Sequence, residues 1–298
     1  MNRNKEYIIQ DLKLNELTSI ERVESLYLKR DDLFAPFTFS NANGTKLRQC
    51  IYLLLKNYDK IDKGIITCCS VHSPQSVLVS SIGKYLDLPV TIFYGGTRED
   101  RFDVLPMPRI ARNLGANLEI VTKMGRISVL NKKAKDRIIN TQEFLVQHGI
   151  DLTNNLDVFF ESVSYQVQNL PDELDNLVIT CGSGISSTGI LYGLKLYNKK
   201  VKNITLVGVA PNRVQKVKNN LKLIENAFNI ELGEVNFNYI DLFNTKGFEY
   251  KKREKGEYCG IQFHPNYEAK TYNWLKDNID YKNEKTCLWI VGKEILDK

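Results

Sequence analysis

The sequence predicts an α/β fold in which mostly parallel sheets are flanked by helices. Strand-like apolar runs alternate with helical patterns from about residue 26 to 209, and strands separated by helices of this length are typical of βαβ units. The 298 residues, 43% of them apolar and 10% aromatic, suffice for one large or two ordinary domains with real cores. No fixed-period repeat or low-complexity linker marks the boundary that we expect near residue 150.

The first region is expected to hold four strands and the helices between them. Leu26–Leu33 begins as a strand and ends in charge, and Pro36 opens a loop toward Asn43-Gly44. Further strands are expected at 64–68, 90–94 and 117–121, with helices at 77–86, 109–114 and 126–148, the last long enough to be broken. The second region repeats the alternation, with an apolar run at 158–160, helices at 164–170 and 190–197, and strands at 177–180 and 204–209.

Composition narrows the functional class. Lys and Arg exceed Asp and Glu by 41 − 35 = 6, a mild excess that fits an anionic small molecule and does not require nucleic acid. The densest basic run, Lys251-Lys252-Arg253, is best interpreted as a solvated loop. Six cysteines without C-x-x-C spacing indicate a reducing compartment, and three scattered histidines predict no metal centre. The polar N-terminus and the lack of an apolar run near the roughly 20 residues of a membrane span predict a soluble, cytoplasmic protein.

One stretch, residues 41–48, predicts a turn that feeds a helix. Asn43-Gly44 is a strong turn dipeptide, Thr45 can cap a helix, and apolar residues then recur at helical spacing. Lys46 therefore falls in the first helical turn, where the positive end of the helix dipole favours the neutral amine. This makes Lys46 a candidate Schiff-base former, although most lysines are only solvated surface.

The sharpest local signal lies between the strand at 177–180 and the following helix. The signal is the stretch Cys181-Gly182-Ser183-Gly184-Ile185-Ser186-Ser187. Its glycines can expose successive backbone N–H groups at a helix start, and its hydroxyls add donors, so that together they can bind an anion. The spacing is neither a Walker A loop nor the dinucleotide G-x-G-x-x-G. The alternative is an ordinary glycine-rich βα turn.

Two further helix starts carry candidate side chains. Ser73-Pro74 is typical of a plain N-cap followed by proline, and a functional interpretation adds that Ser73 or Ser76 can meet a substrate there. Near the C-terminus, residues 264–275 open a helix with Tyr267 and Glu268 at its start. An acid in a first turn needs no functional explanation by itself.

Together these stretches resemble the fold-type II pyridoxal 5′-phosphate (PLP) enzymes, most closely the branch of 1-aminocyclopropane-1-carboxylate deaminase and D-cysteine desulfhydrase. The lysine motif of that branch looks like Leu28-Lys29-Arg30-Asp31-Asp32-Leu33 followed by residues 43–48. A segment of its smaller domain is similar to residues 112–116, and its phosphate loop resembles residues 181–189. The resemblance implies a two-domain, tryptophan synthase β-like fold with the cofactor between the domains. It implies a larger cofactor-binding domain of 1–47 and 151–298, a smaller inserted domain of 48–150, and a homodimer.

The resemblance also implies roles for single residues. Lys46 would carry the cofactor as a Schiff base, and Ser73 and Tyr267 would join it as catalytic residues. Gln75 would lie against the cofactor ring, Glu268 would face the pyridine nitrogen, and residues 181–187 would hold the phosphate. Ser73, Ser76 and Tyr258 would contact the substrate. A carboxylate at the ring nitrogen favours a protonated ring, a better electron sink, and leans toward the deaminases.

The sequence departs from the branch at two places. Pro74 stands where the branch usually has Asn, which removes an amide and a backbone donor for a substrate carboxylate. The segment from 256 to 267 is shorter than its equivalent, which normally supplies a helix over the site. An open, mildly basic site could admit an amino acid attached to something larger, including a nucleotide or nucleic acid.

The expected activity is a PLP-dependent lyase or hydrolase that acts on a small amino acid through an external aldimine, by deamination, β-elimination or ring opening. One alternative is decarboxylation, β-replacement or racemisation of an amino-acid group on a larger, nucleotide-linked substrate. A second is a catalytically inactive binding protein with the same fold. A third is a nucleotide-binding oxidoreductase.

Overall fold

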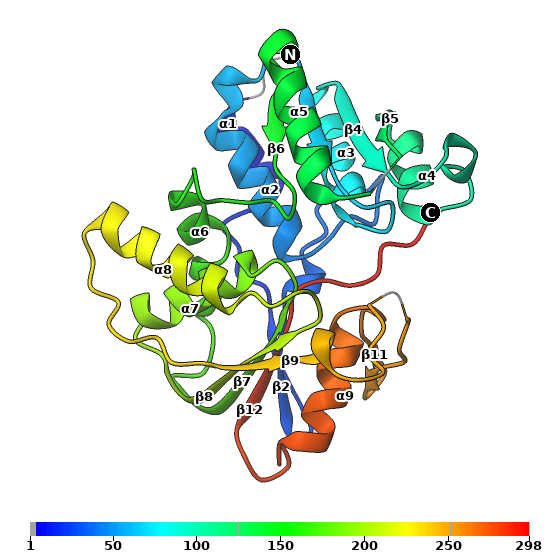
Figure 1. The fold of residues 1–298 in the computed structure, drawn as a ribbon. Coiled ribbons are helices and arrows are strands. Elements are labelled where there is room, and N and C mark those ends of the chain that lie inside the picture. The colour runs from blue at the N-terminus through cyan, green and yellow to red at the C-terminus, as the bar shows by residue number, and fades with distance from the viewer. Residues whose placement is uncertain (1–3, 124, 251, 298) are drawn as a thin grey trace. The chain divides into compact units, whose positions relative to one another are not determined.

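The computed structural model describes residues 4–123, 125–250 and 252–297 and divides the chain into two compact units. The first unit contains residues 1–14, 35–151 and 295–298, and the second contains 15–34 and 152–294. Figure 1 shows the elements of both. The domain limits implied by the resemblance, 1–47 with 151–298 and 48–150, stay a prediction. In the structure the loop and helix that carry Lys46 belong to the first unit.

The first unit is built on a four-stranded parallel sheet in the order β5-β4-β3-β6. Its strands are β3 (Ile65–Cys68), β4 (Val90–Gly95), β5 (Asn117–Thr122) and β6 (Phe144–Val146), and its helices are α1 (Lys5–Asp11), α2 (Thr45–Lys56), α3 (Gln75–Leu86), α4 (Pro106–Asn113) and α5 (Ile127–Thr141). Leu130 and Ala134 of α5 pack on Ile66, Cys68 and Phe93 of the sheet. Each such crossover buries an apolar helix stripe against the strands it connects.

The second unit contains a six-stranded sheet in the order β1-β2-β12-β7-β8-β9, parallel except for β1. Its strands are β1 (Ile20–Val23), β2 (Leu26–Arg30), β7 (Glu173–Cys181), β8 (Lys200–Gly208), β9 (Asn238–Asp241) and β12 (Thr286–Ile290), and its helices are α6 (Asp157–Ser162), α7 (Ile185–Leu196), α8 (Val214–Phe228) and α9 (Glu268–Asn278). The short strands β10 (Glu257–Tyr258) and β11 (Ile261–Gln262) form a separate hairpin. Within this unit α7 and α8 lie on the face of the sheet opposite α9 (Figure 1).

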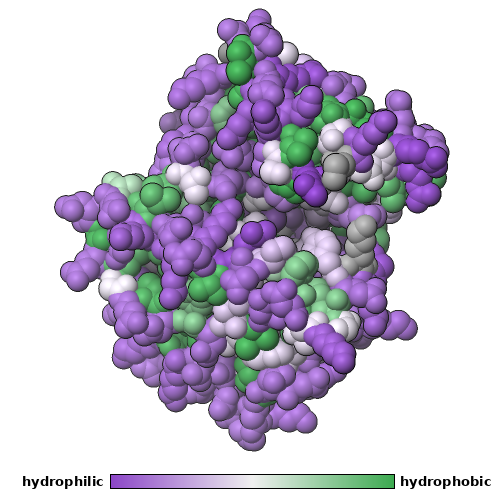
Figure 2. Space-filling view, in the orientation of Figure 1, coloured by the Kyte–Doolittle hydropathy of each residue, from purple (hydrophilic) through white to green (hydrophobic). Residues whose placement is uncertain are grey.

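Buried apolar side chains fill the space between α9 and the second sheet. Leu26, Val178 and Leu288 of the strands pack with Ala269 and Leu275 of the helix, all but inaccessible to solvent. The face seen in Figure 2 is mostly hydrophilic, with hydrophobic residues in separate small areas. Because the apolar surface is buried against sheets, the carboxyl ends of the parallel strands are left to carry polar groups.

The parallel sheets and their covering helices confirm the predicted α/β fold. The helix predicted over 126–148 is wrong over residues 142–148, because α5 ends at Thr141 and Gln142 turns the chain with φ 58°. Residues 144–146 instead form a strand that pairs in parallel with β3, whose edge would otherwise have no neighbour on that side. The apolar run at 158–160 lies in α6.

Candidate active site

Lys46 is the second residue of α2, and its position follows from the glycine before the helix. Gly44 is the N-cap with φ 88°, a left-handed conformation that costs glycine little, and no side chain caps this end. Thr45, the predicted cap, is instead the first helical residue. The helix is anchored by Leu47, Ile51 and other buried apolar residues, so the start of α2 is fixed while Lys46 itself stays partly exposed.

The start of α3 is a tight turn whose backbone donors are largely used within it. The Ser73 N–H donates to the Ser70 carbonyl at 2.9 Å, and the N–H groups of His72 and Gln75 donate to the hydroxyls of Ser70 and Ser73 at 3.3 Å. Pro74 contributes no N–H. The helix begins one residue later than predicted, since Pro74 and not Ser73 is its N-cap, although the Ser73 hydroxyl still accepts from the N–H of Gln75.

Gln75 and Ser76 are buried in this turn. The Gln75 amide donates to Thr67 Oγ1 and the Gln147 carbonyl and accepts from the Gly149 N–H, at 2.7–3.0 Å. Ser76 is 0% exposed and its hydroxyl donates to the Ser73 carbonyl. Both side chains brace the first unit, and their predicted contacts with cofactor and substrate stay predictions.

The turn between β7 and α7 is shorter than the predicted loop. It consists of Gly182, Ser183 and Gly184, because α7 already begins at Ile185 and takes Ser186 and Ser187 into its first turn. Gly184 has φ 83°, and a Cβ there would lie 3.1 Å from Val217 Cγ2, whereas a Cβ on Gly182 would meet nothing within 4 Å. The first N–H groups of a helix have no intrahelical acceptor, so this start presents donors next to open space, as an anion requires.

Glu268 is the most unusual side chain of the second unit. It is the first residue of α9, is 1% exposed, and neither of its oxygens has a hydrogen-bond partner among the described residues. The pKa of Glu268 is raised to about 8, chiefly by burial. The backbone N–H groups of Glu268, Val291 and Gly292 act to lower this pKa, and the charge of Asp32 acts to raise it. A buried carboxyl without a donor favours its neutral form.

Tyr267, the N-cap of α9, is held by its neighbours. Its hydroxyl lies 3.0 Å from that of Tyr250, and its ring meets the His264 ring edge-on at 4.6 Å. Burial raises the pKa of Tyr267 well above its usual value and lowers that of His264 to about 4. Lys270 Nζ fixes the Tyr250 segment by donating to the carbonyls of Glu249 and Tyr250 at 2.8 and 3.1 Å.

Tyr258, predicted to contact the substrate, makes the contacts of a core residue. It is 7% exposed, packs against Tyr272 and Tyr281, and its hydroxyl donates to the Val23 carbonyl at the β1–β2 turn. Because β2 begins after that turn, Val23 lies at the end of β2 remote from Arg30. Its role toward substrate stays a prediction, and Tyr250 is the tyrosine that the structure brings to Tyr267.

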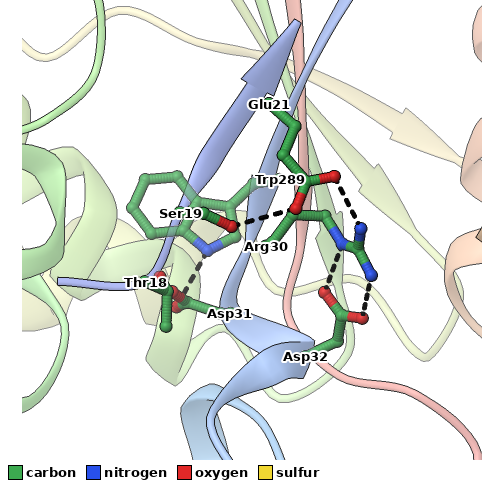
Figure 3. Close-up of polar contacts among 7 residues, drawn as sticks. All are labelled: Thr18, Ser19, Glu21, Arg30, Asp31, Asp32 and Trp289. Carbon is green, nitrogen blue, oxygen red and sulfur yellow. Dashed lines mark hydrogen bonds and ion pairs between the residues drawn. The ribbon is translucent and has the colours of Figure 1, made fainter. Parts of the chain in front are cut away.

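A buried ionic cluster, not assigned from the sequence, follows β2 (Figure 3). Arg30 grips Asp32 with two bonds of 2.9 Å and also binds Glu21 at 2.9 Å, while Trp289 Nε1 donates to Asp31 at 3.1 Å. The motif Lys29-Arg30-Asp31-Asp32 was visible in the sequence, but only the pairing of β2 with β12 shows what its charges face.

These residues fit PLP, judged by the groups that it must satisfy. The carboxyl oxygens of Glu268 have no hydrogen-bond partner among the described residues, so this group could share a proton with a ring nitrogen. The glycine turn before α7 offers backbone donors for a phosphate. Lys46 supplies an amine at a helix start. Among the described residues no cluster of three or more His, Cys, Asp or Glu could hold a metal, and no helix is both long and apolar enough to cross a bilayer.

The family model described as "Pyridoxal-phosphate dependent enzyme" matches residues 9–252, and the chain belongs to that family. The cofactor of the family is PLP, as the resemblance implied, and the fold-type II assignment is confirmed.

One protein similar in sequence is the "O-seryl-dTMP PLP-dependent decarboxylase" of Salmonella phage ViI. It is 24% identical over 353 aligned residues, which cover 97% of this chain and 83% of the relative. Among solved structures, an "ACC deaminase homologue" superposes with a TM-score of 0.75 at 18% identity, over 98% of this chain and 95% of the other. A hydrogen sulfide-producing enzyme from Fusobacterium nucleatum gives 0.59 at 12% identity, over 95% of each chain. At these identities the structural likenesses show the fold alone.

Proposed function

We propose that this PLP-dependent enzyme decarboxylates an amino-acid group carried on a larger, nucleotide-linked molecule. The observation that carries the proposal is the phage relative, whose name states such a reaction and whose alignment spans 97% of this chain. The cytoplasmic homodimer and the predicted domain limits belong to the same proposal.

The turn before α3 supports loss of a carboxylate. The N–H groups of His72, Ser73 and Gln75 are bonded within the turn, and Pro74 has none. Donors that grip a carboxylate stabilise it most in its charged ground state, and this slows its departure as neutral CO2. Because these N–H groups are already hydrogen-bonded within the turn, they do not hold the carboxylate, and this suits a reaction in which the carboxylate must leave.

The proposed roles of the chain's residues follow from their chemistry. Lys46 would hold the cofactor through its aldehyde and would yield that position to the substrate amine. The bond from Cα to the carboxyl carbon breaks, CO2 departs without the electron pair, and one proton returns to Cα from Lys46 or Tyr267. When bound, the cofactor supplies the electron sink for that pair. Glu268 shares a proton with the ring nitrogen, and the start of α7 binds the phosphate.

The exposed side of the Tyr267 pair supports a substrate larger than a free amino acid. Tyr250 is 38% exposed and its hydroxyl is bonded to that of Tyr267. An exposed aromatic ring is suited to stacking on a nucleotide base.

The test incubates the purified, PLP-loaded protein with serine ether-linked to thymidine monophosphate and, separately, with free L-serine. We expect the linked substrate to lose the mass of CO2 with its amine retained, and Lys46→Ala to leave it unchanged. Release of ammonia and a keto acid, with no CO2, would overturn the proposal.

A variant of the α3 turn sharpens this test. Pro74→Asn restores a backbone N–H and a side-chain amide, and one hydrogen bond to the charged carboxylate should slow CO2 loss about tenfold. Val71→Ala in the same turn, which adds no donor, serves as the control. An unchanged or faster rate in Pro74→Asn would remove the turn as support.

A second candidate is deamination or β-elimination of a small amino acid. It is favoured by the Tyr267-Glu268 pair, which is similar to the deaminase motif and in which Glu268 is buried without a donor. Ammonia and keto-acid release over a panel of free amino acids distinguishes it from decarboxylation.

A further inference from the structure

Two acidic side chains of the second unit lie together at the carboxyl ends of neighbouring strands. Asp32 follows β2 and is 3% exposed, and Glu268 is 1% exposed beside the backbone N–H groups that follow β12. The two strands are paired in parallel, with Ile290 opposite Arg30, so the residues after them meet at the same sheet edge. Two carboxyls in such a place do not both ionise unless both are paired.

The cation of this edge is committed to Asp32. Arg30 Nε and Nη2 bond the two oxygens of Asp32 at 2.9 Å each, and its Nη1 bonds Glu21 at 2.9 Å (Figure 3). This two-bond pairing joins Asp32 to a guanidinium in an ion pair. Lys29, the other cation of the motif, donates instead to the Thr18 carbonyl and to Asn169 Oδ1.

Within the part of the chain that the structure describes, Glu268 has no comparable partner. The charged or titratable groups that act on it there are Asp32 and the Tyr267 phenol, neither of them a cation. The backbone N–H groups of Glu268, Val291 and Gly292 are near, but neither carboxyl oxygen has a hydrogen bond of good geometry. Protonation is therefore the way of neutralising the buried Glu268 carboxyl that costs the least free energy.

We propose that Asp32, fixed in its ion pair with Arg30, is a positioning residue that keeps a proton on the buried Glu268 carboxyl before any cofactor binds. The chain itself then brings the proton that the cofactor's ring nitrogen takes up. The transfer would be a simple acid–base step: the O–H bond of Glu268 would break as an N–H bond forms on the ring nitrogen, and the Glu268 carboxylate would balance the positive charge so gained. The inference rests on the proposed role of Glu268 at the ring and deepens it.

The experiment uses the full-length apoprotein, so that cofactor and substrate play no part. Infrared spectra with ¹³C-labelled glutamate are recorded across pH, and Glu268→Gln assigns the C=O band of the protonated Glu268 side chain. We expect that band at pH 7 in the wild type. In Asp32→Asn its titration midpoint should fall by about one pH unit, a tenfold stronger acid.

Matched variants separate charge from structure. Asp32→Glu retains the carboxylate and should titrate like the wild type, and Glu21→Gln removes the other carboxylate bound to Arg30 and should also leave the midpoint in place. In Asp32→Asn the side chain of Arg30 is still bonded to Glu21 but has lost Asp32, and this variant could fail to fold. Asp32→Asn combined with Arg30→Gln removes the pair together; because a positive charge is lost as well, the midpoint should fall in the same direction but by less.

Three outcomes would overturn the inference: no protonated band at pH 7, a midpoint unmoved when Asp32 is neutralised, or an equal fall in Glu21→Gln. None of them bears on decarboxylation, which is assayed with the loaded enzyme. Failure of the decarboxylation assay would likewise leave the protonation of Glu268 standing.

Discussion

Two helices in different units begin in the same way and present opposite chemistry. Gly44 precedes α2 with φ 88°, and Gly184 precedes α7 with φ 83°, and neither helix start is capped by a side chain. The start of α2 carries the amine of Lys46, whereas the start of α7 carries the hydroxyls of Ser186 and Ser187. Glycine gives both starts the sharp entry that brings the chain from a turn into the helix.

The difference shows how one backbone device serves two groups. At α7 the helix dipole attracts an anion, so the backbone itself is the binding group. At α2 the same dipole opposes an ammonium and favours an amine that can bond an aldehyde. A third start, α9, places the acid of Glu268 where the dipole would favour a negative charge, yet burial without a donor outweighs the dipole there.

The largest expected effect is at the start of α2. Lys46→Ala should abolish covalent attachment of the cofactor and lower activity by about 10³-fold or more, because it removes the attaching amine and a proton carrier. The visible spectrum, with borohydride trapping and mass mapping of the labelled residue, measures this. Lys56→Ala, at the other end of the same helix, is the control and should keep both. A label on another lysine would show that the wrong amine was chosen.

The acid at the start of α9 should make apoprotein stability depend on pH. Since the pKa of folded Glu268 is raised to about 8 from the usual 4.5, its stabilising contribution is fully present below about pH 4.5 and is lost as the pH rises toward 8. Stability should therefore fall between pH 6.5 and 8.5, by at most about 1.4 kcal/mol per pH unit.

Denaturant unfolding of the apoprotein at several pH values measures this fall, and Glu268→Gln should flatten it. Glu231→Gln, which removes an exposed carboxyl, is the control. The range avoids His264, whose lowered pKa makes stability fall as the pH drops from 6.5 to about 4. An equally steep fall in Glu268→Gln would contradict the assignment.

The glycines before α7 separate backbone strain from anion binding. Gly184→Ala puts a side chain at φ 83° and 3.1 Å from Val217 Cγ2, which should cost about 1–3 kcal/mol of unfolding free energy. Gly182→Ala meets no atom within 4 Å and should change stability by less than about 0.5 kcal/mol. If this turn holds the phosphate, Gly182→Ala should still weaken PLP binding, measured by titration of the apoprotein. Unchanged affinity in both variants would assign the phosphate elsewhere.

The smallest effect is expected at the tyrosine pair. Tyr250→Phe removes the hydrogen bond to Tyr267 and should cost about 0.5–1.5 kcal/mol, toward the lower end because Tyr250 is partly exposed. Equilibrium unfolding measures the loss, with Tyr7→Phe at another exposed ring as the control. A larger change in kcat than in KM would link the pair to proton handling, and no change in either would leave it structural.

The α/β fold could be predicted from the sequence, because alternating apolar periods and glycine-marked turns are local properties that can be recognised without contacts. The family and its cofactor were predicted from the resemblance of a few motifs to those of known enzymes. The prediction failed where local pattern and tertiary pairing compete: residues 142–148 were expected in a helix, but 144–146 complete the edge of β3.

The contacts of the candidate site residues were decided by tertiary structure. Packing, and not distance in the sequence, brings the rings together: Tyr258 lies in the core beside Tyr272, and Tyr250 meets Tyr267. Asp32 and Glu268, 236 positions apart in the sequence, come near each other because β2 pairs with β12 in parallel and the residues that follow β12 lie beside the start of α9. The amino-acid sequence determined which ionisable side chains are present, and burial and strand pairing decided which of them carry a charge.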